Sequence, residues 1–330
     1  MGGKLNHLIL AVVFFLCLGG LWAEEISQEE PGGSLTPIVL EAQEDGARGL
    51  FREAEEAASR GKYAKAAKYY KRLAEQQRNP SLAAACVHRQ AELLVQAGKA
   101  FHAKVAFEKL LEGYPFQIQL ERVLEQLRAL ADDFEQGRGT TFHLRDPRAA
   151  IAIYRLIIKH QPSIERSLED RMVLAKKLEL EKMWEGAVAL YQETIKKAPK
   201  DPDCRFQLAK VLHYLARHDG DSDGERSKAA IRQAESFLQL AREKDFRREQ
   251  AKTLIAECRE DEGARMLERA KFYLGKYHFR PQVARRYLHD ILRQLPQTAA
   301  AREATDILKE NFPEETGSVP DDTAEKGEAK

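Results

Sequence analysis

Residues 184–199, with the sequence WEGAVALYQETIKKAP, decide the fold that we expect for this chain. Ala187 is followed one helical turn later by an aromatic residue, Tyr191, and the segment ends at Pro199. The same alanine–aromatic–proline pattern recurs elsewhere with some variation, and its other copies are Ala66, Tyr70 and Pro80; Ala103, Phe107 and Pro115; Ala150, Tyr154 and Pro162; and Ala284, Ile291 and Pro296. In the last four copies along the chain the proline follows the alanine by twelve residues. A recurring unit of this kind predicts an internally repeated structure.

The pattern has a physical cause in the packing of helical hairpins. Two antiparallel helices approach closely only where both carry small side chains, and a large side chain one turn on fills the space beside the crossing. Proline then ends the second helix, because it cannot continue one. A second column of small residues is expected in the first helices, at Ala54, Ala91, Ala175 and Ala209. A generic helical bundle is the alternative, but it gives no reason for the repetition.

The period and the pattern resemble the tetratricopeptide repeat. That resemblance implies an all-α, tetratricopeptide-type helical-hairpin solenoid with about five to six repeats and a capping helix. Composition agrees, since alanine, leucine, glutamate, lysine and arginine dominate the 330 residues and all of them favour helices. We place the solenoid at residues 46–312.

The two ends differ in composition from this body. Residues 8–18 form an apolar run after Lys4, and Ala23 offers a small residue before two acids, which predicts a secretory signal peptide at 1–23. The acidic stretches 24–45 and 313–330 have little to bury and are expected to be a disordered linker and tail. An uncleaved anchor stays open, and so does lipidation at Cys17, although Leu16 before it is not small.

The net charge of +1 conceals a basic body between acidic ends. Such a body could attract an anionic surface or partner, so a peripheral membrane association stays open; the alternative is an ordinary solvated surface. Aromatic residues are not interleaved with the bases as they are in nucleic-acid grooves, and we expect no nucleic-acid partner.

No pattern in the sequence indicates catalysis, so we predict neither an enzyme nor a cofactor. Gly98-Lys99 lacks the serine or threonine of a phosphate loop, and neither G-x-S-x-G nor H-E-x-x-H occurs. Asp219, Asp221, Asp223 and Gly224 match the first half of a calcium loop, but its twelfth position is Ala230 instead of glutamate, and we predict no metal site. Three cysteines fall on predicted helices and are expected to be small core residues: Cys86, Cys204 and Cys258.

The remaining candidate site is the inner face of the first helices, where repeats of this type meet their ligands. Apolar and aromatic residues flanked by charges could hold an extended peptide there. Aligned on the alanine columns, the candidate groove residues are Arg48, Phe51, Glu55, His88, Glu92, Met172, Lys176, Phe206, Lys210 and His213. Several of them could equally line a solvated groove.

A narrower resemblance comes from the loop 136–144 with the Arg145-Asp146-Pro147 that follows it, and from a C-terminal pattern. The C-terminal residues concerned are Ala270, Tyr273, Ala284, Tyr287, Ile291, Leu292, Pro296, Ala301, Ala304 and Leu308. Together with the predicted signal, these features resemble BamD, the tetratricopeptide component of the outer-membrane β-barrel assembly machine. The resemblance covers roughly residues 47–310, and the sequence departs from it in its poor lipidation motif and in two longer loops.

The BamD resemblance implies an exported protein in the periplasm, at the inner face of the outer membrane, that binds assembly subunits and unfolded β-barrel substrates. It makes Arg145 and Asp146 a candidate partner loop. One alternative is a generic periplasmic tetratricopeptide adaptor for other envelope proteins. The other is an accessory that presents substrates to a hydrolase or transferase.

Overall fold

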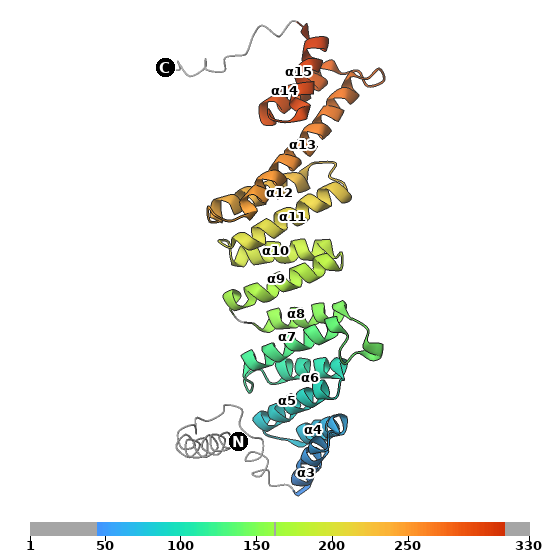
Figure 1. Ribbon diagram of the computed structural model, residues 1–330, viewed down its shortest axis with the longest axis vertical. Coiled ribbons are helices and arrows are strands. Elements are labelled where there is room, and N and C mark those ends of the chain that lie inside the picture. Colours follow the sequence, from blue (N-terminus) through green and yellow to red (C-terminus); the bar gives the residue numbers. More distant parts are fainter. Residues whose placement is uncertain (1–44, 162, 314–330) are drawn as a thin grey trace, which may run out of the picture. The chain divides into compact units, whose positions relative to one another are not determined.

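The computed structural model describes residues 45–161 and 163–313, and within these ranges it shows helices, turns and no strand (Figure 1). Its α-helices are α3 (Asp45–Ser59), α4 (Tyr63–Gln76), α5 (Pro80–Gln96), α6 (Ala100–Gly113), α7 (Leu120–Gln136), α8 (Pro147–His160), α9 (Ile164–Leu180), α10 (Trp184–Lys197), α11 (Pro202–His218), α12 (Glu225–Leu240), α13 (Arg247–Leu274), α14 (Pro281–Gln294) and α15 (Ala299–Asn311). The predicted all-α fold of helical hairpins is confirmed.

Three of the predicted segments fall on parts of the chain that the structure does not describe. The predicted signal peptide lies outside the described residues, as do the linker apart from residue 45 and the tail apart from residue 313. Among the helices that are described, none combines the length and apolarity needed to cross a membrane.

Helix starts follow from local sequence. Proline stands in the first turn of α5, α8, α11 and α14, where its missing N–H would have no helical partner. Side chains before several helices accept hydrogen bonds from otherwise unpaired backbone N–H groups: Asn79, Asp146, Ser163, Asp201 and Thr298. Short turns join helix pairs such as α3 and α4, α5 and α6, and α9 and α10.

The chain divides into two compact units, and the division runs through α7. The first unit holds α3 to α6, the start of α7 and residues 138–143. The second holds the rest of α7 and all that follows residue 144. In each unit consecutive helices pack as antiparallel pairs (Figure 1).

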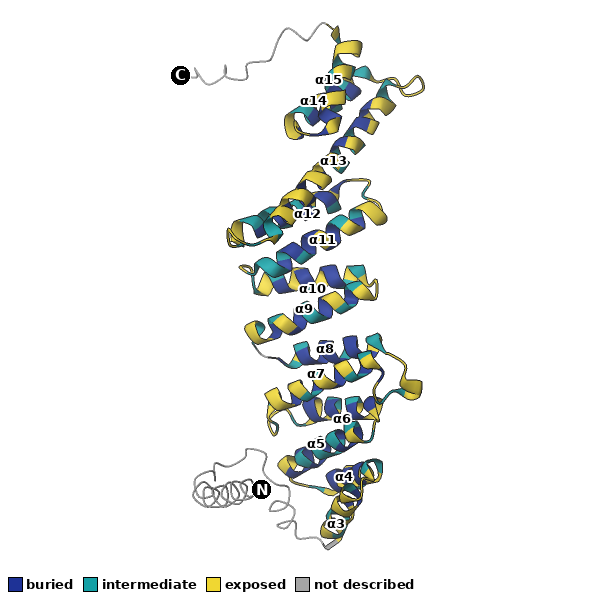
Figure 2. Ribbon diagram, viewed as in Figure 1, coloured by how far each residue is buried: buried dark blue, intermediate teal, exposed yellow. Residues whose placement is uncertain are grey.

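Both predicted alanine columns lie inside the hairpins. Every alanine named for them, from Ala54 and Ala66 to Ala284, is 0 % exposed. The aromatic residues one turn later are buried as well: Tyr70, Phe107, Tyr154 and Tyr191. Figure 2 shows the consequence in both units, with buried residues on the facing sides of the helices and exposed ones outside. The spacing of alanine and aromatic residues in the sequence therefore marks positions where two helices do cross in the structure.

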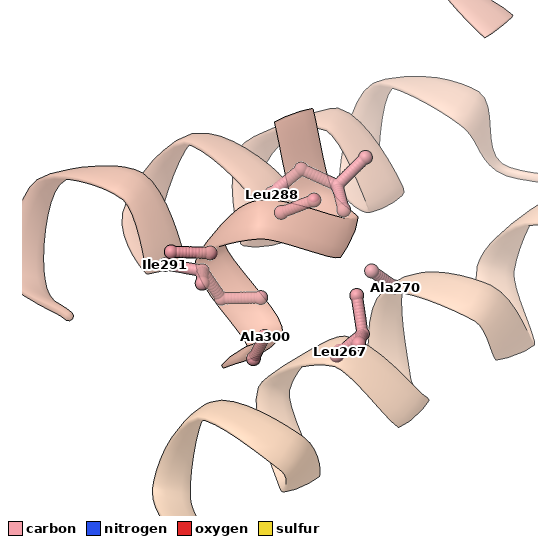
Figure 3. Close-up of a cluster of buried hydrophobic side chains, with 7 residues drawn as sticks. Leu267, Ala270, Leu288, Ile291 and Ala300 are labelled. Carbon is pink, nitrogen blue, oxygen red and sulfur yellow. The ribbon is translucent and has the colours of Figure 1, made fainter. Parts of the chain in front are cut away.

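The C-terminal hairpin closes on a small apolar cluster (Figure 3). Leu267 and Ala270 of α13 meet Leu288 and Ile291 of α14, and the small residues at the start of α15 cover them. Gly263 permits this approach, because a Cβ there would lie 3.0 Å from the Cβ of Ala300. The cluster fixes α15 against α13 and places the α14–α15 turn beside it.

The end of α12 differs from what the sequence predicts. The helix-favouring residues continue to about 243, whereas α12 ends at Leu240. The guanidinium of Arg248, from the next helix, donates to the carbonyl oxygens of Leu238 and Ala241 at 2.6 and 3.1 Å. These bonds satisfy the carbonyl groups that end α12, so the chain turns early.

Candidate protein-binding site

A cavity of about 740 Å³ lies in the second unit, between α12, the first half of α13 and the α14–α15 turn. Its apolar lining comes from Leu238 of α12, Ile255 and Ala256 of α13, and Leu295 and Pro296 of the turn. On α13 the lining residues recur at intervals of three and four, which places them on one stripe of the helix. The cavity forms because the α14–α15 turn, which is remote in sequence, lies opposite this stripe of α13.

Charged side chains of both signs line the same cavity. Arg259 pairs with Glu235 at 3.1 Å, Lys252 with Glu249 at 2.7 Å, and Arg293 with Asp290 at 2.6 Å. Apart from Asp290, the side chains of these pairs are about half-exposed or more. Ion pairs this exposed contribute little to stability, so their charges can turn to a ligand. Apolar surface flanked by exchangeable charges suits an extended peptide segment.

Glu260 occupies one end of the cavity and acts on the helix beside it. Its carboxylate oxygens accept from the backbone N–H of Ala299, the first residue of α15, at 3.0 and 3.3 Å. A carboxylate is favoured at a helix N-terminus by the unpaired N–H groups and the helix dipole. The same N-terminus is capped from within by Thr298, whose hydroxyl accepts from Ala301.

In the first unit the structure brings the predicted groove residues into two small clusters. Phe51 meets the Tyr70 ring edge-on at 6.2 Å, and the Tyr70 hydroxyl donates to Glu55 at 2.6 Å. Burial, and then the bond to Glu55, raise the pKa of Tyr70, so the phenol stays protonated. Arg48 lies exposed on the same helix.

The second cluster of this unit lies one hairpin further on. His88 packs against the Phe107 ring at 6.4 Å, and its Nε2 lies 3.7 Å from Glu92. Glu92 also pairs with Arg89 at 3.1 Å and with Arg122 at 3.5 Å. Basic side chains of α5 and α7 therefore converge on Glu92.

In the second unit the five predicted groove residues are not all accessible. Lys176 and Lys210 are exposed, and Met172 is half-buried with the Cys204 thiol 3.3 Å from its sulfur. Phe206 is only 3 % exposed. Its ring packs on Phe237 at 4.9 Å, with the side chains of Lys210 and Arg247 over it at 5.8 and 5.7 Å. Phe206 is therefore covered by these side chains and does not line an open groove.

His213, the last predicted groove residue, joins a thiol and a carboxylate from α13. Its Nδ1 lies 3.2 Å from the Cys258 sulfur and its Nε2 lies 3.0 Å from Glu257. This order resembles an activated nucleophile. However, Cys258 is 0 % exposed, and burial raises its pKa to about 12. The thiol therefore stays protonated and donates to His213, which orients the ring and provides no reactive thiolate.

The predicted partner loop is anchored by the two residues that the sequence singled out. The Arg145 guanidinium donates to the carbonyl oxygen of Glu135 at 2.7 Å. The Asp146 N–H donates to that of Phe134 at 2.9 Å, and its carboxylate accepts from Ala149 at the start of α8. Both side chains therefore tie the loop to the helices on either side. Phe142 and Leu144 of this loop are both largely exposed, and sequence reasoning selected neither.

The acidic turn 219–224 is a helix cap. Asp221 accepts from the Ser227 N–H at 2.8 Å, the Ser227 hydroxyl at 2.6 Å and the Arg226 N–H at 3.0 Å, and it pairs with Arg265 at 3.1 Å. Gly224 follows with a φ of 75°, where a Cβ would meet Arg265 at 2.9 Å. The residues that resembled half a calcium loop therefore organise the start of α12.

The Asp221 cap predicts a pH-dependent stability. Burial acts to raise its pKa, but the hydrogen bonds from Ser227, Arg226 and Arg265 outweigh it and hold the pKa at about 2. Because the pKa of Asp221 in the folded protein lies below the value of about 3.9 for an unfolded chain, its carboxylate stabilises the fold by about 2 kcal/mol at a pH above 3.9. This stabilisation is lost as the pH falls toward 2. Asp221→Asn should therefore lower the free energy of unfolding at pH 7, and the difference from wild type should shrink as pH falls through 4 and 3. Urea titrations of both proteins across this range measure it; a difference independent of pH would contradict the assignment.

No protein-family model and no curated protein matches this chain. Solved structures do match at low identity. A MamA double mutant is 15 % identical over 61 % of this chain and 98 % of its own, with a TM-score of 0.29. YrrB, titled a TPR protein with an unusual peptide-binding site, is 18 % identical over 65 % and 95 %, with a TM-score of 0.32. The TPR2AB domain of yeast Sti1, in a complex with pHSP90, is 15 % identical over 79 % and 96 %, with a TM-score of 0.25.

The deciding observation is the chain's own geometry, in which both alanine columns are fully buried at the crossings of successive hairpins. The fold is of the tetratricopeptide type. In folds of this type stability comes from each hairpin and its neighbours, so surfaces between hairpins can vary without loss of the core. The cavity between α12, α13 and the α14–α15 turn is such a surface.

Proposed function

We propose that the protein is a repeat scaffold that holds other proteins, and that the cavity between α12, α13 and the α14–α15 turn receives an extended segment of the partner. The observation that carries this proposal is the cavity itself: about 740 Å³, with an apolar lining and charges of both signs. Apolar contacts would supply affinity, and the charges would select the register of the bound segment.

The finer proposal is a role similar to that of BamD, in which an exported scaffold assists the assembly of β-barrel proteins at the outer membrane. It is supported by the sequence resemblance at the partner loop and at the C-terminal helices. The architecture of those segments fits it, since Arg145 and Asp146 hold a defined loop and α13 to α15 form a tight terminal cluster. Export would be directed by the signal peptide that the apolar run 8–18 predicts. A generic periplasmic adaptor is the alternative role.

Charge reversal at the cavity should weaken partner capture. In the double variant Arg259→Glu/Arg293→Glu we expect about a tenfold loss of affinity, because two exposed charges contribute roughly 1.4 kcal/mol together. The measurement is an affinity pull-down with the full chain from gently solubilised native membranes, followed by quantitative mass spectrometry. Lys68→Glu/Lys71→Glu on α4 makes the same charge change at exposed positions far along the sequence and serves as the control.

Each result of this pull-down decides between the proposals. Recovery of the outer-membrane barrel-assembly subunit, reduced by the cavity variant and not by the control, supports the BamD-like role. Recovery of other envelope proteins with the same dependence supports the adaptor and overturns the finer role. If the cavity variant captures partner proteins as well as the wild type does, the proposal that the cavity binds the partner is overturned.

A further inference from the structure

The loop 275–280, between α13 and α14, carries exposed aromatic side chains at its tip and base. Tyr277 is 91 % exposed and Phe279 is 65 % exposed, and Phe272 in the last turn of α13 is 52 % exposed. Figure 1 shows the loop protruding beyond the ends of the two helices that it joins, and Figure 2 shows it exposed along its length. Large apolar rings held in water in this way mark an interaction surface.

Local bonds hold these rings outward. The Arg280 N–H donates to the carbonyl oxygen of Tyr273 at 2.8 Å, and the His278 N–H donates to that of Gly275 at 3.1 Å. The His278 ring stacks on Phe272 at 4.3 Å with an interplanar angle of 22°. Because the loop is closed on itself, Tyr277 and Phe279 project from it and do not fold back onto α13.

The charge around the loop is of one sign. No aspartate or glutamate occurs between Arg269 and His289. Lys271 pairs with Glu303 of α15, but among the described residues no ion pair engages Lys276, Arg280 or Arg286. The rings therefore lie among several positive charges that the rest of the described structure does not neutralise.

We propose that this loop, with Phe272, docks onto the surface of an anionic phospholipid bilayer. Aromatic rings enter the headgroup boundary, and lysine and arginine beside them pair with anionic lipids. Shape favours a bilayer over a peptide, because the rings stand on a protruding loop and the peptide-sized cavity lies among other residues of the unit. Shape also disfavours nucleic acid, which stacks on aromatic residues along a basic groove, whereas here His278 already covers Phe272. The inference is independent of the proposed function.

The test places a probe in the loop, because the apolar run 8–18 is itself expected to bind lipid and total binding would not report on the loop. The full chain carrying Tyr277→Trp is mixed with vesicles of equal parts phosphatidylglycerol and phosphatidylcholine whose acyl chains are brominated. The signal of wild type, which contains Trp22 and Trp184, is subtracted. We expect quenching of the tryptophan at position 277, and none in vesicles of phosphatidylcholine alone.

Two matched controls accompany the probe. Phe246→Trp places a tryptophan at another exposed aromatic position, where the neighbouring Arg247 pairs with Asp203 and Asp245, and it should not be quenched. Adding Lys276→Gln/Arg280→Gln to the probe variant should raise the lipid concentration for half-maximal quenching about 25-fold, at about fivefold per charge. Lys196→Gln/Lys200→Gln makes an equal charge change and should leave it unaltered.

Three results would overturn the proposal. These are an unquenched probe at position 277, equal quenching in vesicles without anionic lipid, and equal quenching at position 246. Protection of the probe from iodide by a single-stranded oligonucleotide or an acidic peptide, in place of vesicles, would assign the loop to that partner instead.

Discussion

Phe107→Ala should lower the free energy of unfolding of the first unit by about 3–5 kcal/mol, the usual cost of deleting a buried phenylalanine ring. Phe107 is buried in α6, packs against His88 of α5 and follows Ala103, which is fully buried. Its loss leaves a void at the position where the ring fills the space beside a helix crossing. Since His88 packs on this ring, the Glu92 cluster should loosen as well. Guanidinium unfolding followed by far-ultraviolet circular dichroism measures the change.

Phe116→Ala is the matched control, because Phe116 is almost fully exposed in the same unit. Removing its ring should change the free energy of unfolding by no more than about 0.5 kcal/mol. If the two variants had similar stability, the aromatic column would not hold the hairpins together and the physical reading of the repeat would be wrong.

Asp170→Ala should destabilise the second unit by about 2–3 kcal/mol, the cost of removing a charged hydrogen-bond partner from a partly buried ion pair. The Asp170 side chain is 5 % exposed, and both of its carboxylate oxygens accept from Arg128 at 2.9 Å. This two-point contact joins α9 to α7. Without the carboxylate, the partly buried guanidinium loses this two-point contact and the two helices lose a fixed alignment.

A double-mutant cycle separates the pair from its surroundings. Arg128→Ala and the double variant Arg128→Ala/Asp170→Ala are measured by urea unfolding, and the double variant should cost less than the sum of the single ones. The neighbouring Glu169→Ala, at an exposed position, should have an effect near zero. Strict additivity of the two single changes would show that the contact carries no coupling energy.

The hairpins could be predicted from sequence because their determinants are local. Alanine at a crossing, an aromatic residue one turn later and proline at the end act within a single hairpin, and all of these alanines proved to be buried. Helix ends were predictable for the same reason, through prolines and capping side chains. The early end of α12 was not, because the covering guanidinium of Arg248 comes from the following helix.

The cavity could not be predicted in the same way. It needs α12, α13 and a turn some forty residues further along the chain, and nothing in a repeat pattern indicates where that turn returns. For Phe206 the alignment could not reveal that Arg247, from α13, covers the ring. The structural role of Arg145 was hidden for a similar reason, since its partner is a backbone carbonyl group with no sequence signature.

The continuity of α13 has a geometric consequence. One unbroken helix from Arg247 to Leu274 carries the cavity stripe at one end and the aromatic loop at the other. Because each residue of an α-helix adds about 100° of rotation, the azimuth of the loop relative to the cavity is set by the number of residues between them. Turns can change in length without altering this phase, whereas a single residue gained or lost within α13 would point the two surfaces in unrelated directions.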